Sequence, residues 1–491
     1  MDPRCRSGHD IGSSVIPPLD GTDSVTPASL LVRAIPYDDP FAAFRRFADL
    51  PGAVLLDSAR IDDRLGRFSF IAADPFLTLE SRDGEIAGGG RSWRGDPFAA
   101  LADLLGQFAI EPRPELPPFQ GGAAGWFAYD LGRHLERLPI QAVDDQPIPD
   151  LAVGFYDLVL AFDHQAKSAW AVASGLPEAD PSARRVRADR RLAWALDRLA
   201  GPLPPLPPPA PLPKPRPDIG RDAHMAMVQR VIDYIYAGDI YQANVSQRFR
   251  TPLPAGFDPL PLYARLRRDN PAPFAAFLRF GDAAILSASP ERFLRLAHGR
   301  VETRPIKGTR PRGATPEADR ALADDLAASD KDRAENLMIV DLLRNDLSRV
   351  CKPHSVEVPS LFAVESYATV HHLVSTVTGT LEAGQGPVDL LRATFPGGSI
   401  TGAPKIRAME IIAELERNRR GLYCGSIGYI GFDGAMDTSI VIRTIVCAGG
   451  MASFQVGGGI VADSDPAAEY QETLDKGRAL MAAIEGKEPA R

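Results

Sequence analysis

The sequence has few cysteines, no long apolar run and no excess of basic residues, and each of these shortages excludes a class of protein. Its four cysteines form no C-x-x-C pair, which gives no sign of a disulfide framework or a zinc knuckle. No apolar stretch has the length of a membrane span, and the N-terminus lacks the apolar core of a signal peptide. With 55 basic and 63 acidic residues, the formal charge of −8 provides no basic surface for nucleic acid. We therefore expect a globular protein of the reducing cytoplasm.

The composition is that of a folded chain, with 45% hydrophobic and 24% charged residues over 491 positions. Residues 1–28 lack periodicity and are rich in Gly, Ser, Asp and Pro, so we predict a disordered tail. Proline occupies ten of the sixteen positions from 202 to 217, which predicts a stiff, extended spacer over 201–218. A proline-rich ligand segment is the alternative interpretation. The spacer would separate an N-terminal region, 29–200, from a C-terminal domain, 219–487.

Hydrophobic periodicity predicts both helices and strands in the C-terminal domain. Apolar residues at helical spacing run from Met225 to Ile235 and end at Gly238, and residues 241–249 alternate as in a half-buried strand. Further strands are predicted at 283–289, 299–306, 371–380, 426–432, 438–447 and 452–457, and helices at 317–328, 330–347, 403–416 and 466–485. Because the order does not alternate as β-α-β, we predict an α+β fold with largely antiparallel sheets.

Two of the predicted helices carry a pair of acidic residues near the N-terminus. Ser329 can cap the first of them, where Asp332 and Glu335 then share a face. Glu469 and Glu472 repeat this spacing in the last helix. Acids in a first turn also interact favourably with the helix dipole without any ligand. Like charges three residues apart destabilise a helix, however, and Mg²⁺ bound by oxygen ligands alone would compensate.

Two glycine-rich segments can approach an anion closely. Gly457, Gly458 and Gly459 lie between a strand and a helix, where backbone N–H groups can face a phosphate or a carboxylate. The segment matches neither the P-loop nor the dinucleotide fingerprint. The turn at 395–405 opens a helix whose N-terminus can likewise face an anion, or it is an ordinary turn and cap.

Two charged residues stand beside apolar strands. Arg443 interrupts an otherwise apolar strand, so we expect it to meet a carboxylate of the protein or of a ligand. Glu291 follows an apolar strand and would be a general acid if it is buried. Otherwise it forms a surface ion pair with Arg292 or Arg295.

Lys307 lies where the strand predicted at 299–306 ends. Arg304, Arg310 and Arg312 crowd this turn, and neighbouring cations favour a neutral, nucleophilic lysine. Taken alone, a lysine in a turn is more often simply solvated.

Together and in this order, the motifs resemble the chorismate-utilising enzymes, strongly over 220–485 and more loosely before. The resemblance implies a large α+β domain with two packed, mainly antiparallel sheets flanked by helices, as in anthranilate synthase component I. The Pro-Ile-Lys-Gly-Thr motif around Lys307 and the stretch from Asp332 to Asn336 are similar to members that form 4-amino-4-deoxychorismate. Anthranilate-forming members carry alanine in place of the lysine. Gln242 stands where isochorismate- and salicylate-forming members place a lysine base, which argues against attack of water at C2.

The resemblance implies an Mg²⁺-dependent amination of chorismate. Asp332, Glu335, Glu469 and Glu472 would hold the ion, directly or through water. Lys307 would add at C2 while Glu291 protonates the departing C4 hydroxyl, and ammonia would then add at C4 and expel the lysine. Arg443, Tyr429 and backbone donors at 457–459 would hold the enolpyruvyl carboxylate. The matched substrate-binding positions are Gln242, His372, Ser399, Tyr429, Arg443, Gly457, Gly458, Gly459 and Lys476. A separate lyase would complete 4-aminobenzoate, a folate precursor.

The source of ammonia is expected outside the chain. The sequence has no G-x-C-x-G nucleophile elbow, so we expect a partner glutaminase of the class I glutamine amidotransferase type. Two alternatives stay open: an anthranilate synthase component, and a non-catalytic subunit that binds an amino acid. For the latter, Leu55-Leu-Asp-Ser58 resembles the Leu-Leu-Glu-Ser motif near which anthranilate synthases bind tryptophan, with Asp57 in place of glutamate.

Overall fold

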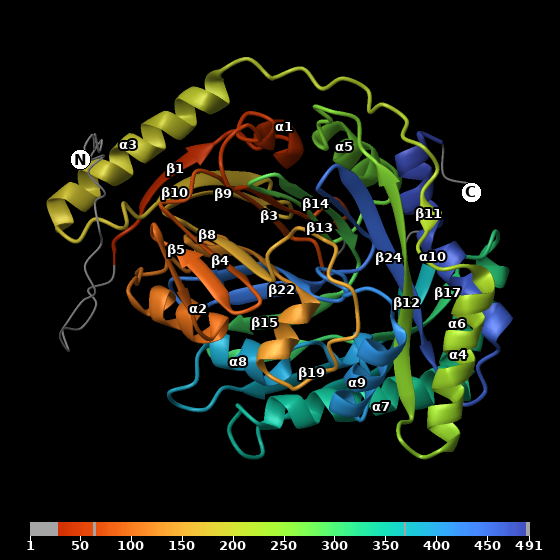
Figure 1. The fold of residues 1–491 in the computed structure, drawn as a ribbon. Coiled ribbons are helices and arrows are strands. Elements are labelled where there is room, and N and C mark those ends of the chain that lie inside the picture. The colour runs from red at the N-terminus through yellow and green to blue at the C-terminus, as the bar shows by residue number, and fades with distance from the viewer. Residues whose placement is uncertain (1–27, 62–64, 368–369, 488–491) are drawn as a thin grey trace, which may run out of the picture.

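Two large sheets form the centre of the molecule, and each takes strands from both sides of the proline-rich segment (Figure 1). The computed structural model describes residues 28–61, 65–367 and 370–487, so the predicted tail lies outside it apart from residue 28. The ladders that join the strands are antiparallel, as predicted. The N-terminal and C-terminal regions therefore share both sheets.

In both sheets the spatial order of the strands differs from their order in the sequence. The first sheet contains, in spatial order, β1 (Leu31–Ile35), β10 (Ser168–Ala173), β9 (Leu158–Asp163), β3 (Phe68–Ala72), β2 (Ala53–Asp57), β13 (Phe274–Phe280), β14 (Ala283–Ser289), β23 (Thr444–Ala448), β24 (Met451–Ile460), β12 (Gln242–Pro252) and β11 (Arg216–Pro217), with β20 (Gly402–Ala403) also beside β12. The second contains β17 (Ile306–Pro311), β19 (Val370–Thr380), β16 (Arg300–Thr303), β15 (Arg292–Ala297), β22 (Met436–Ile440), β21 (Ser426–Gly431), β7 (Gly122–Phe127), β8 (Leu151–Tyr156), β4 (Leu77–Arg82), β5 (Glu85–Gly88) and β6 (Arg91–Arg94), with β18 (Glu357–Ser366) also beside β19.

Helices cover the outer faces of the two sheets. They are α1 (Pro40–Phe44), α2 (Pro97–Gly106), α3 (Pro181–Ala200), α4 (Arg221–Tyr236), α5 (Leu260–Asp269), α6 (Pro316–Ala328), α7 (Asp330–Ser348), α8 (Pro387–Thr394), α9 (Lys405–Leu415) and α10 (Pro466–Glu485), with short 3₁₀ helices η1 (Tyr129–His134) and η2 (Gly398–Ile400). A layer of buried residues from both sheets, among them Val54, Trp126 and Ile285, fills the space between them. None of the described helices is both long and apolar enough to cross a bilayer.

The proline-rich segment is held against the body of the protein along its length. The Leu212 N–H donates to the Ile484 carbonyl (3.0 Å), and the Thr251 hydroxyl donates to the Pro213 carbonyl (2.8 Å). In Figure 1 this segment arches from α3 to β11. Because these contacts join it to β12 and to the end of α10, it fixes the C-terminal helix as well as linking the two regions.

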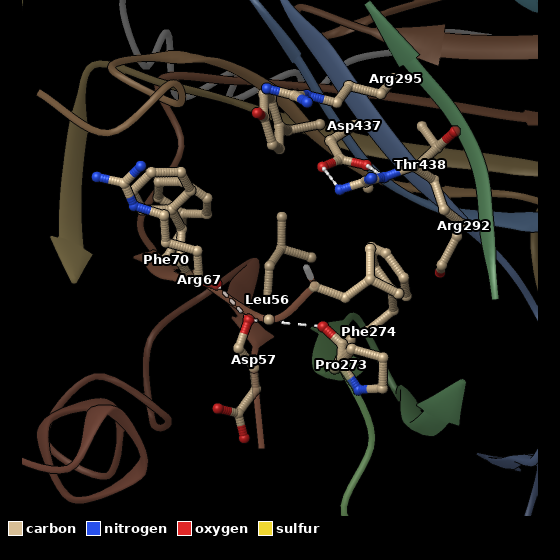
Figure 2. Close-up of a pocket in the computed structure, with 18 of the residues that line it drawn as sticks. Leu56, Asp57, Arg67, Phe70, Pro273, Phe274, Arg292, Arg295, Asp437 and Thr438 are labelled. Carbon is tan, nitrogen blue, oxygen red and sulfur yellow. Dashed lines mark hydrogen bonds and ion pairs between the residues drawn. The ribbon is translucent and has the colours of Figure 1, made fainter. Parts of the chain in front are cut away.

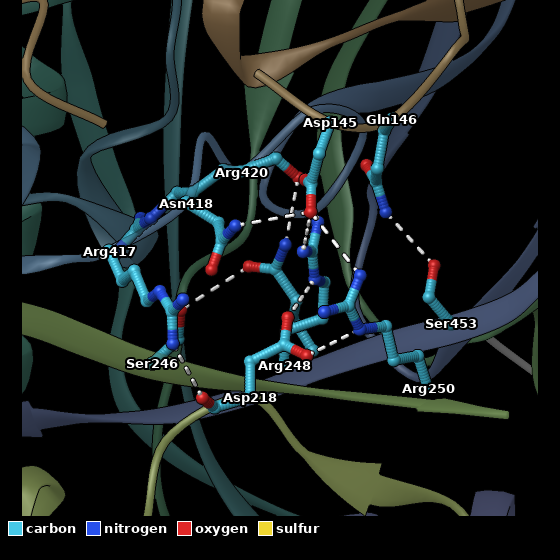
Figure 3. Close-up of polar contacts among 11 residues, drawn as sticks. Asp145, Gln146, Asp218, Ser246, Arg248, Arg250, Arg417, Asn418, Arg420 and Ser453 are labelled. Carbon is cyan, nitrogen blue, oxygen red and sulfur yellow. Dashed lines mark hydrogen bonds and ion pairs between the residues drawn. The ribbon is translucent and has the colours of Figure 1, made fainter. Parts of the chain in front are cut away.

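A buried arginine fastens the end of this segment to the middle of β12. Arg248 is 5% exposed and donates two hydrogen bonds to Asp145 (2.8 and 2.7 Å) and one to Asp218 (2.7 Å) (Figure 3). Removing one partner of such a buried ion pair costs about 3–5 kcal/mol, because the other charge is left unpaired. The cluster therefore ties residues of the N-terminal region to the strand that carries Gln242.

The helices that carry the acidic pairs begin where the sequence predicts. The Ser329 side chain accepts a hydrogen bond from the Asp332 N–H (3.3 Å) at the start of α7, and Asp465 accepts from the first turn of α10. Helix α7 packs on β17 and β19, and α10 packs on β24. The caps therefore fix one acidic pair beside β17 and the other beside β24, where Gly308 and Gly458 approach Asp332 and Glu469.

Two predicted strands were wrong in extent. The segment predicted at 438–447 is interrupted at residues 441–443, because β22 lies in the second sheet and β23 in the first. Its apolar side chains are buried on both sides of the crossing, so hydrophobicity alone does not mark the break. The strand predicted at 299–306 ends as β16 at Thr303, and a new strand, β17, begins at Ile306.

Candidate active site

Lys307 lies inside a strand, and the prediction of a turn at this position was wrong. Strand β17 pairs with β19, but the register shifts between Ile306 and Thr309, which places Lys307 in a bulge. Gly308 has a φ of 82°, and a Cβ there would lie 2.9 Å from Cγ of Asp332. Glycine is therefore required for β17 to pass this close to α7.

The arginines around Lys307 are each held by a carboxylate. Arg304 pairs with Glu365 (2.5 Å), Arg310 with Asp325 (2.6 Å) and Asp332 (3.1 Å), and Arg312 with Asp319 (2.5 Å). None of the three arginines is among the main causes of the lowered pKa of Lys307.

Burial is the main cause of the lowered pKa of Lys307, with a smaller contribution from the charge of Lys476. The carboxylates of Glu335, Glu291 and Glu472 oppose this change. The fold therefore brings Lys307 close enough to four predicted site residues for their charges to affect its pKa, namely Lys476, Glu335, Glu291 and Glu472. The lysine stands among acids rather than among cations.

Glu291 is buried, 7% exposed, and its pKa is raised to about 7, first of all by removal from water. The Ser399 hydroxyl donates to its Oε1 (2.8 Å), and the Ile306 N–H also donates to the carboxylate. The alternative of a surface ion pair with Arg292 is excluded, because Arg292 pairs with Asp437 (3.0 Å) and Glu302 (3.1 Å). A carboxyl group that is half protonated near neutral pH lies beside Lys307.

Arg443 lies on the crossing between the two sheets and has a φ of 54°, a strained conformation for arginine. Burial lowers its pKa, and among the described residues its guanidinium makes no hydrogen bond or ion pair. It is electrostatically coupled to His372, whose pKa is lowered to about 4, mainly by burial. The His372 Nδ1 lies 2.8 Å from the Thr309 hydroxyl on β17. A desolvated cation without a protein partner is suited to an anionic ligand.

The resemblance implies that Tyr429 and Arg443 hold one carboxylate, and the structure places Tyr429 in the layer between the two sheets. The Tyr429 ring stacks on Phe119, with ring centroids 4.5 Å apart, in the layer between the sheets. The tyrosine that affects the charge of Arg443 is Tyr423, which the sequence reasoning missed. A signal for it was the sequence Arg419-Arg420-Gly-Leu-Tyr423, a polar turn that leads into a buried strand.

The four predicted metal ligands lie as two pairs near the N-terminal ends of α7 and α10. Across residues 28–61, 65–367 and 370–487, no three His, Cys, Asp or Glu side chains are assembled as a metal cluster. Asp332 accepts from Arg310 (3.1 Å), and Glu472 pairs with Lys476 (2.6 Å).

The other two acids, Glu335 and Glu469, have a raised pKa, caused mainly by burial. Glu469 accepts a hydrogen bond from the Ser464 hydroxyl (2.7 Å). A carboxylate withdrawn from water is stabilised by a nearby cation, and all the donors here are hard oxygens. The donor atoms are therefore of the chemical type that Mg²⁺ prefers, although the four carboxylates do not form a cluster among the described residues.

The three predicted glycines belong to β24 and allow close contacts on both of its faces. A Cβ on Gly458 would lie 3.0 Å from Oε2 of Glu469, and one on Gly459 would lie 2.2 Å from Nε2 of Gln242. The Gly457 carbonyl accepts from Lys476 (2.9 Å). Strand β23 pairs with β24 only over Met451–Ser453, so beyond this point alternate backbone N–H groups of β24 point away from its one neighbour, β12.

The turn at 395–405 carries a buried ion pair of its own. Lys405, the first residue of α9, donates to Asp346 (2.5 Å) and to the Thr394 carbonyl (2.9 Å). The Asp346 carboxylate is thus bound at the first residue of α9, the helix whose N-terminus was predicted either to face an anion or to be an ordinary cap. The contribution of the turn to the site is Ser399, which η2 directs towards Glu291.

A separate cavity of about 360 Å³ lies between the sheets, and it is not the site of Lys307 (Figure 2). Tyr429, Arg292 and Ser58 line it, whereas Lys307, Glu291 and Arg443 do not. The segment that resembles the tryptophan motif thus borders this cavity. The carboxylate of Asp57, however, is bound by Arg267 (2.6 Å) and Tyr263 (3.0 Å).

Comparison with known proteins agrees with this arrangement. A family model described as chorismate binding enzyme matches residues 55–482. Aminodeoxychorismate synthase component 1 of Salmonella typhimurium is 47% identical over 454 residues, which cover 91% of this chain and 96% of that protein. Anthranilate synthase component 1 of Thermus thermophilus is 44% identical over 452 residues, with coverages of 91% and 96%.

The fold agrees as well. The crystal structure of anthranilate synthase component I from Streptococcus pneumoniae superposes with a TM-score of 0.76 at 35% identity, over 86% of this chain and 94% of that one. The predicted fold, two large antiparallel sheets flanked by helices, is confirmed by this likeness and by the sheet topology. The chain therefore belongs to the family of chorismate binding enzymes.

Proposed function

We propose that the chain converts chorismate and ammonia to 4-amino-4-deoxychorismate. The observation that carries the proposal is Lys307, a lysine of lowered pKa beside an acid whose pKa is about 7. Relatives named for anthranilate synthesis and relatives named for aminodeoxychorismate synthesis are both similar over nine-tenths of the chain, so overall identity separates them poorly. The lysine in Pro-Ile-Lys-Gly-Thr favours the second group, because anthranilate-forming members carry alanine there.

In the proposed first step, Lys307 Nζ attacks C2 of chorismate, and both ring double bonds shift as the C4–O bond breaks. The electron pair of that bond leaves with the oxygen. A neutral amine is required, and the burial that lowers the pKa of Lys307 favours it. The product of this step is an adduct on the chain's own lysine.

Glu291 supplies the proton that the leaving oxygen needs. With a pKa of about 7, its carboxyl group is protonated in a useful fraction of molecules near neutral pH. The C4 hydroxyl therefore departs as water. Ammonia then forms a bond to C4, both ring double bonds shift back, and the C2–Nζ bond breaks with its electrons returning to Lys307. The added nitrogen loses one proton, which restores the acid form of Glu291.

The proposed substrate anchors are the unpaired cation and the acidic helix ends. Arg443 would bind the enolpyruvyl carboxylate, since it has no acidic partner among the described residues. Asp332, Glu335, Glu469 and Glu472 would hold Mg²⁺, which when bound would neutralise the ring carboxylate and draw electron density from the ring. His372, neutral because its pKa is about 4, would line the same pocket.

A second protein would supply the ammonia. The described cysteines, Cys351, Cys424 and Cys447, are buried free thiols whose pKa values are raised to about 11, 12 and 12 by burial, so none is activated for glutamine hydrolysis. Several relatives are named component 1 of their enzymes. We therefore propose a glutaminase as the partner, and the cytoplasm, where free thiols persist, as the location.

Product identification tests the function. The purified chain is mixed with chorismate, Mg²⁺ and ammonium, and the products are separated with and without an added aminodeoxychorismate lyase. We expect an amine that the lyase converts to 4-aminobenzoate, and no turnover after chelation of Mg²⁺.

Three outcomes would contradict the proposal. Fluorescent anthranilate formed without lyase would identify an anthranilate synthase. Turnover without ammonium would indicate attack by water. Complete inactivity with ammonium at saturating Mg²⁺ would favour a non-catalytic subunit.

A further inference from the structure

One amide on β12 connects the two sides of the proposed reaction. The Nδ2 of Asn244 donates to the Ser399 carbonyl (2.8 Å), and its Oδ1 accepts from Nε2 of Gln242 (3.3 Å). Ser399 in turn donates its hydroxyl to Glu291. Asn244 thus contacts Ser399, which donates to the proposed general acid, and the buried amide of Gln242.

These hydrogen bonds fix the orientation of both amides. The Ser399 carbonyl only accepts, so the NH₂ group of Asn244 must face it, and the oxygen of Asn244 must face Gln242. Gln242 then directs its own NH₂ group towards Asn244. Its Oε1 is left as an acceptor, and in the part of the chain that the structure describes this buried atom has no hydrogen-bond partner.

A buried acceptor without a donor is unfavourable, by about 1–3 kcal/mol. Gln242 is 0% exposed, and Gly459 beneath it leaves room for no side chain, since a Cβ there would lie 2.2 Å from Nε2 of Gln242. A small ligand with N–H donors would satisfy Oε1. Ammonia, the nucleophile of the proposed reaction, is such a donor.

The backbone of Asn244 is held as firmly as its side chain. Its N–H donates to the Thr401 carbonyl (2.8 Å), and its carbonyl accepts from Arg420 (2.6 Å). Arg420 also donates to the Ile400 carbonyl (3.1 Å), so one buried arginine braces Asn244 against the residue next to Ser399. Backbone hydrogen bonds of β12 to Thr401 and to Arg420 therefore fix the geometry of this contact.

We propose that Asn244 is a positioning residue that holds the Ser399 hydroxyl against Glu291 and turns the free Oε1 of Gln242 towards the incoming ammonia. The inference rests on the proposed amination of chorismate. The side chain of Asn244 would thus align both Glu291, the acid that protonates the leaving hydroxyl, and the ammonia that replaces it.

The test compares Asn244→Ala with Ser246→Ala, a matched control. Ser246 lies on the same face of the same strand and is buried, and its hydroxyl donates to Glu416 (2.9 Å) rather than touching Ser399 or Gln242. Two quantities are measured with ammonium as the nitrogen source: KM for ammonium, and the pH at which kcat/KM for chorismate falls on the alkaline side.

We expect Asn244→Ala to raise KM for ammonium about tenfold, as for a lost hydrogen bond of about 1.4 kcal/mol. The alkaline fall should move to higher pH, because Glu291 loses the Ser399 hydrogen bond that stabilises its carboxylate. In a Ser399→Ala background, Asn244→Ala should move the alkaline fall no further. Ser246→Ala should change neither quantity.

Lower kcat in Asn244→Ala, with both quantities unchanged, would overturn the inference, as would equal changes in Ser246→Ala. If Asn244→Ala does not fold, Asn244→Leu fills the same volume, removes both hydrogen bonds and carries the same two expectations. A wild-type chain that forms 4-amino-4-deoxychorismate while neither Asn244 variant shifts either quantity refutes the positioning role alone. A wild-type chain that forms none refutes the proposed function and this inference together.

Discussion

Two charged regions of the molecule differ in how their charges are paired. Towards the cavity between the sheets, three of the four lining arginines have carboxylate partners: Arg67 with Asp163, Arg292 with Asp437 and Glu302, and Arg304 with Glu365. Towards Lys307 the opposite holds. Arg443 has no acidic partner among the described residues, Lys307 has a lowered pKa, and Glu291 has a raised one.

The difference teaches how to separate structural charges from functional ones in this molecule. A buried charge with a good partner costs the fold little, whereas a buried charge without one is destabilising until a ligand arrives. Groups with a perturbed pKa and an incomplete partner set are therefore candidates for chemistry. By this criterion the site lies around Lys307, although the cavity of about 360 Å³ lies elsewhere.

The largest effect is expected for Lys307→Ala. Loss of the nucleophile should reduce formation of 4-amino-4-deoxychorismate by about 10³-fold or more, or redirect the product towards anthranilate. Product analysis after incubation with chorismate, Mg²⁺ and ammonium measures both outcomes.

Arg312→Ala is the control for this prediction, because that arginine flanks Lys307 in sequence but pairs with Asp319 at the surface. It should change the rate little. Unchanged kinetics in Lys307→Ala would refute the nucleophile role, and an equal loss in Arg312→Ala would point to a general effect of β17 on the fold.

The sequence predicts the helical frame of this site well because its signals are local. The Ser329 cap and the spacing of Asp332 and Glu335 place two acids on one helix face, and no distant residue is needed to see it. The same holds for α10, whose predicted and observed bounds coincide at 466–485.

The sequence does not predict which charges meet. Arg304, Arg310 and Arg312 are near Lys307 in the chain, yet their partners come from β18 and α6 and from Asp332. Tyr429 and Tyr423 are six residues apart, yet the first stacks on Phe119 and the second affects the charge of Arg443. Pairing across long sequence separation depends on sheet topology, which hydrophobic periodicity does not encode.

A pair of arginine variants should separate the two regions by stability as well as by activity. Arg443→Gln should lower kcat/KM for chorismate by about 10²-fold, as expected for a charged hydrogen bond to a substrate carboxylate worth about 3 kcal/mol. The same change should leave the free protein as stable or more stable, because it removes a desolvated, unpaired charge.

Arg292→Gln should do the reverse. It leaves Asp437 and Glu302 without their cation, so the free energy of unfolding should fall by about 3 kcal/mol, while the rate per folded molecule changes little. Chemical denaturation and steady-state kinetics on both variants measure the comparison. Destabilisation of the chain by Arg443→Gln would show that the arginine has a structural partner, and the contrast between the regions would then fail.

The smallest effect concerns the pH dependence set by Glu291. A general acid must be protonated, and the pKa of Glu291 is about 7. The titration of Glu291 should therefore leave kcat/KM constant below pH 7 and lower it tenfold per pH unit above pH 7. Ser399 stabilises the carboxylate form through its 2.8 Å hydrogen bond. Ser399→Ala removes this donor, favours the protonated form and should move the alkaline fall upward by about one pH unit.

Ser426→Ala is the control, since this buried serine donates to the Ser439 carbonyl and does not touch Glu291. A downward shift in Ser399→Ala, or the same alkaline fall in Glu291→Gln as in the wild type, would show that another group controls the alkaline side, and the acid of the first step would have to be sought elsewhere in the site.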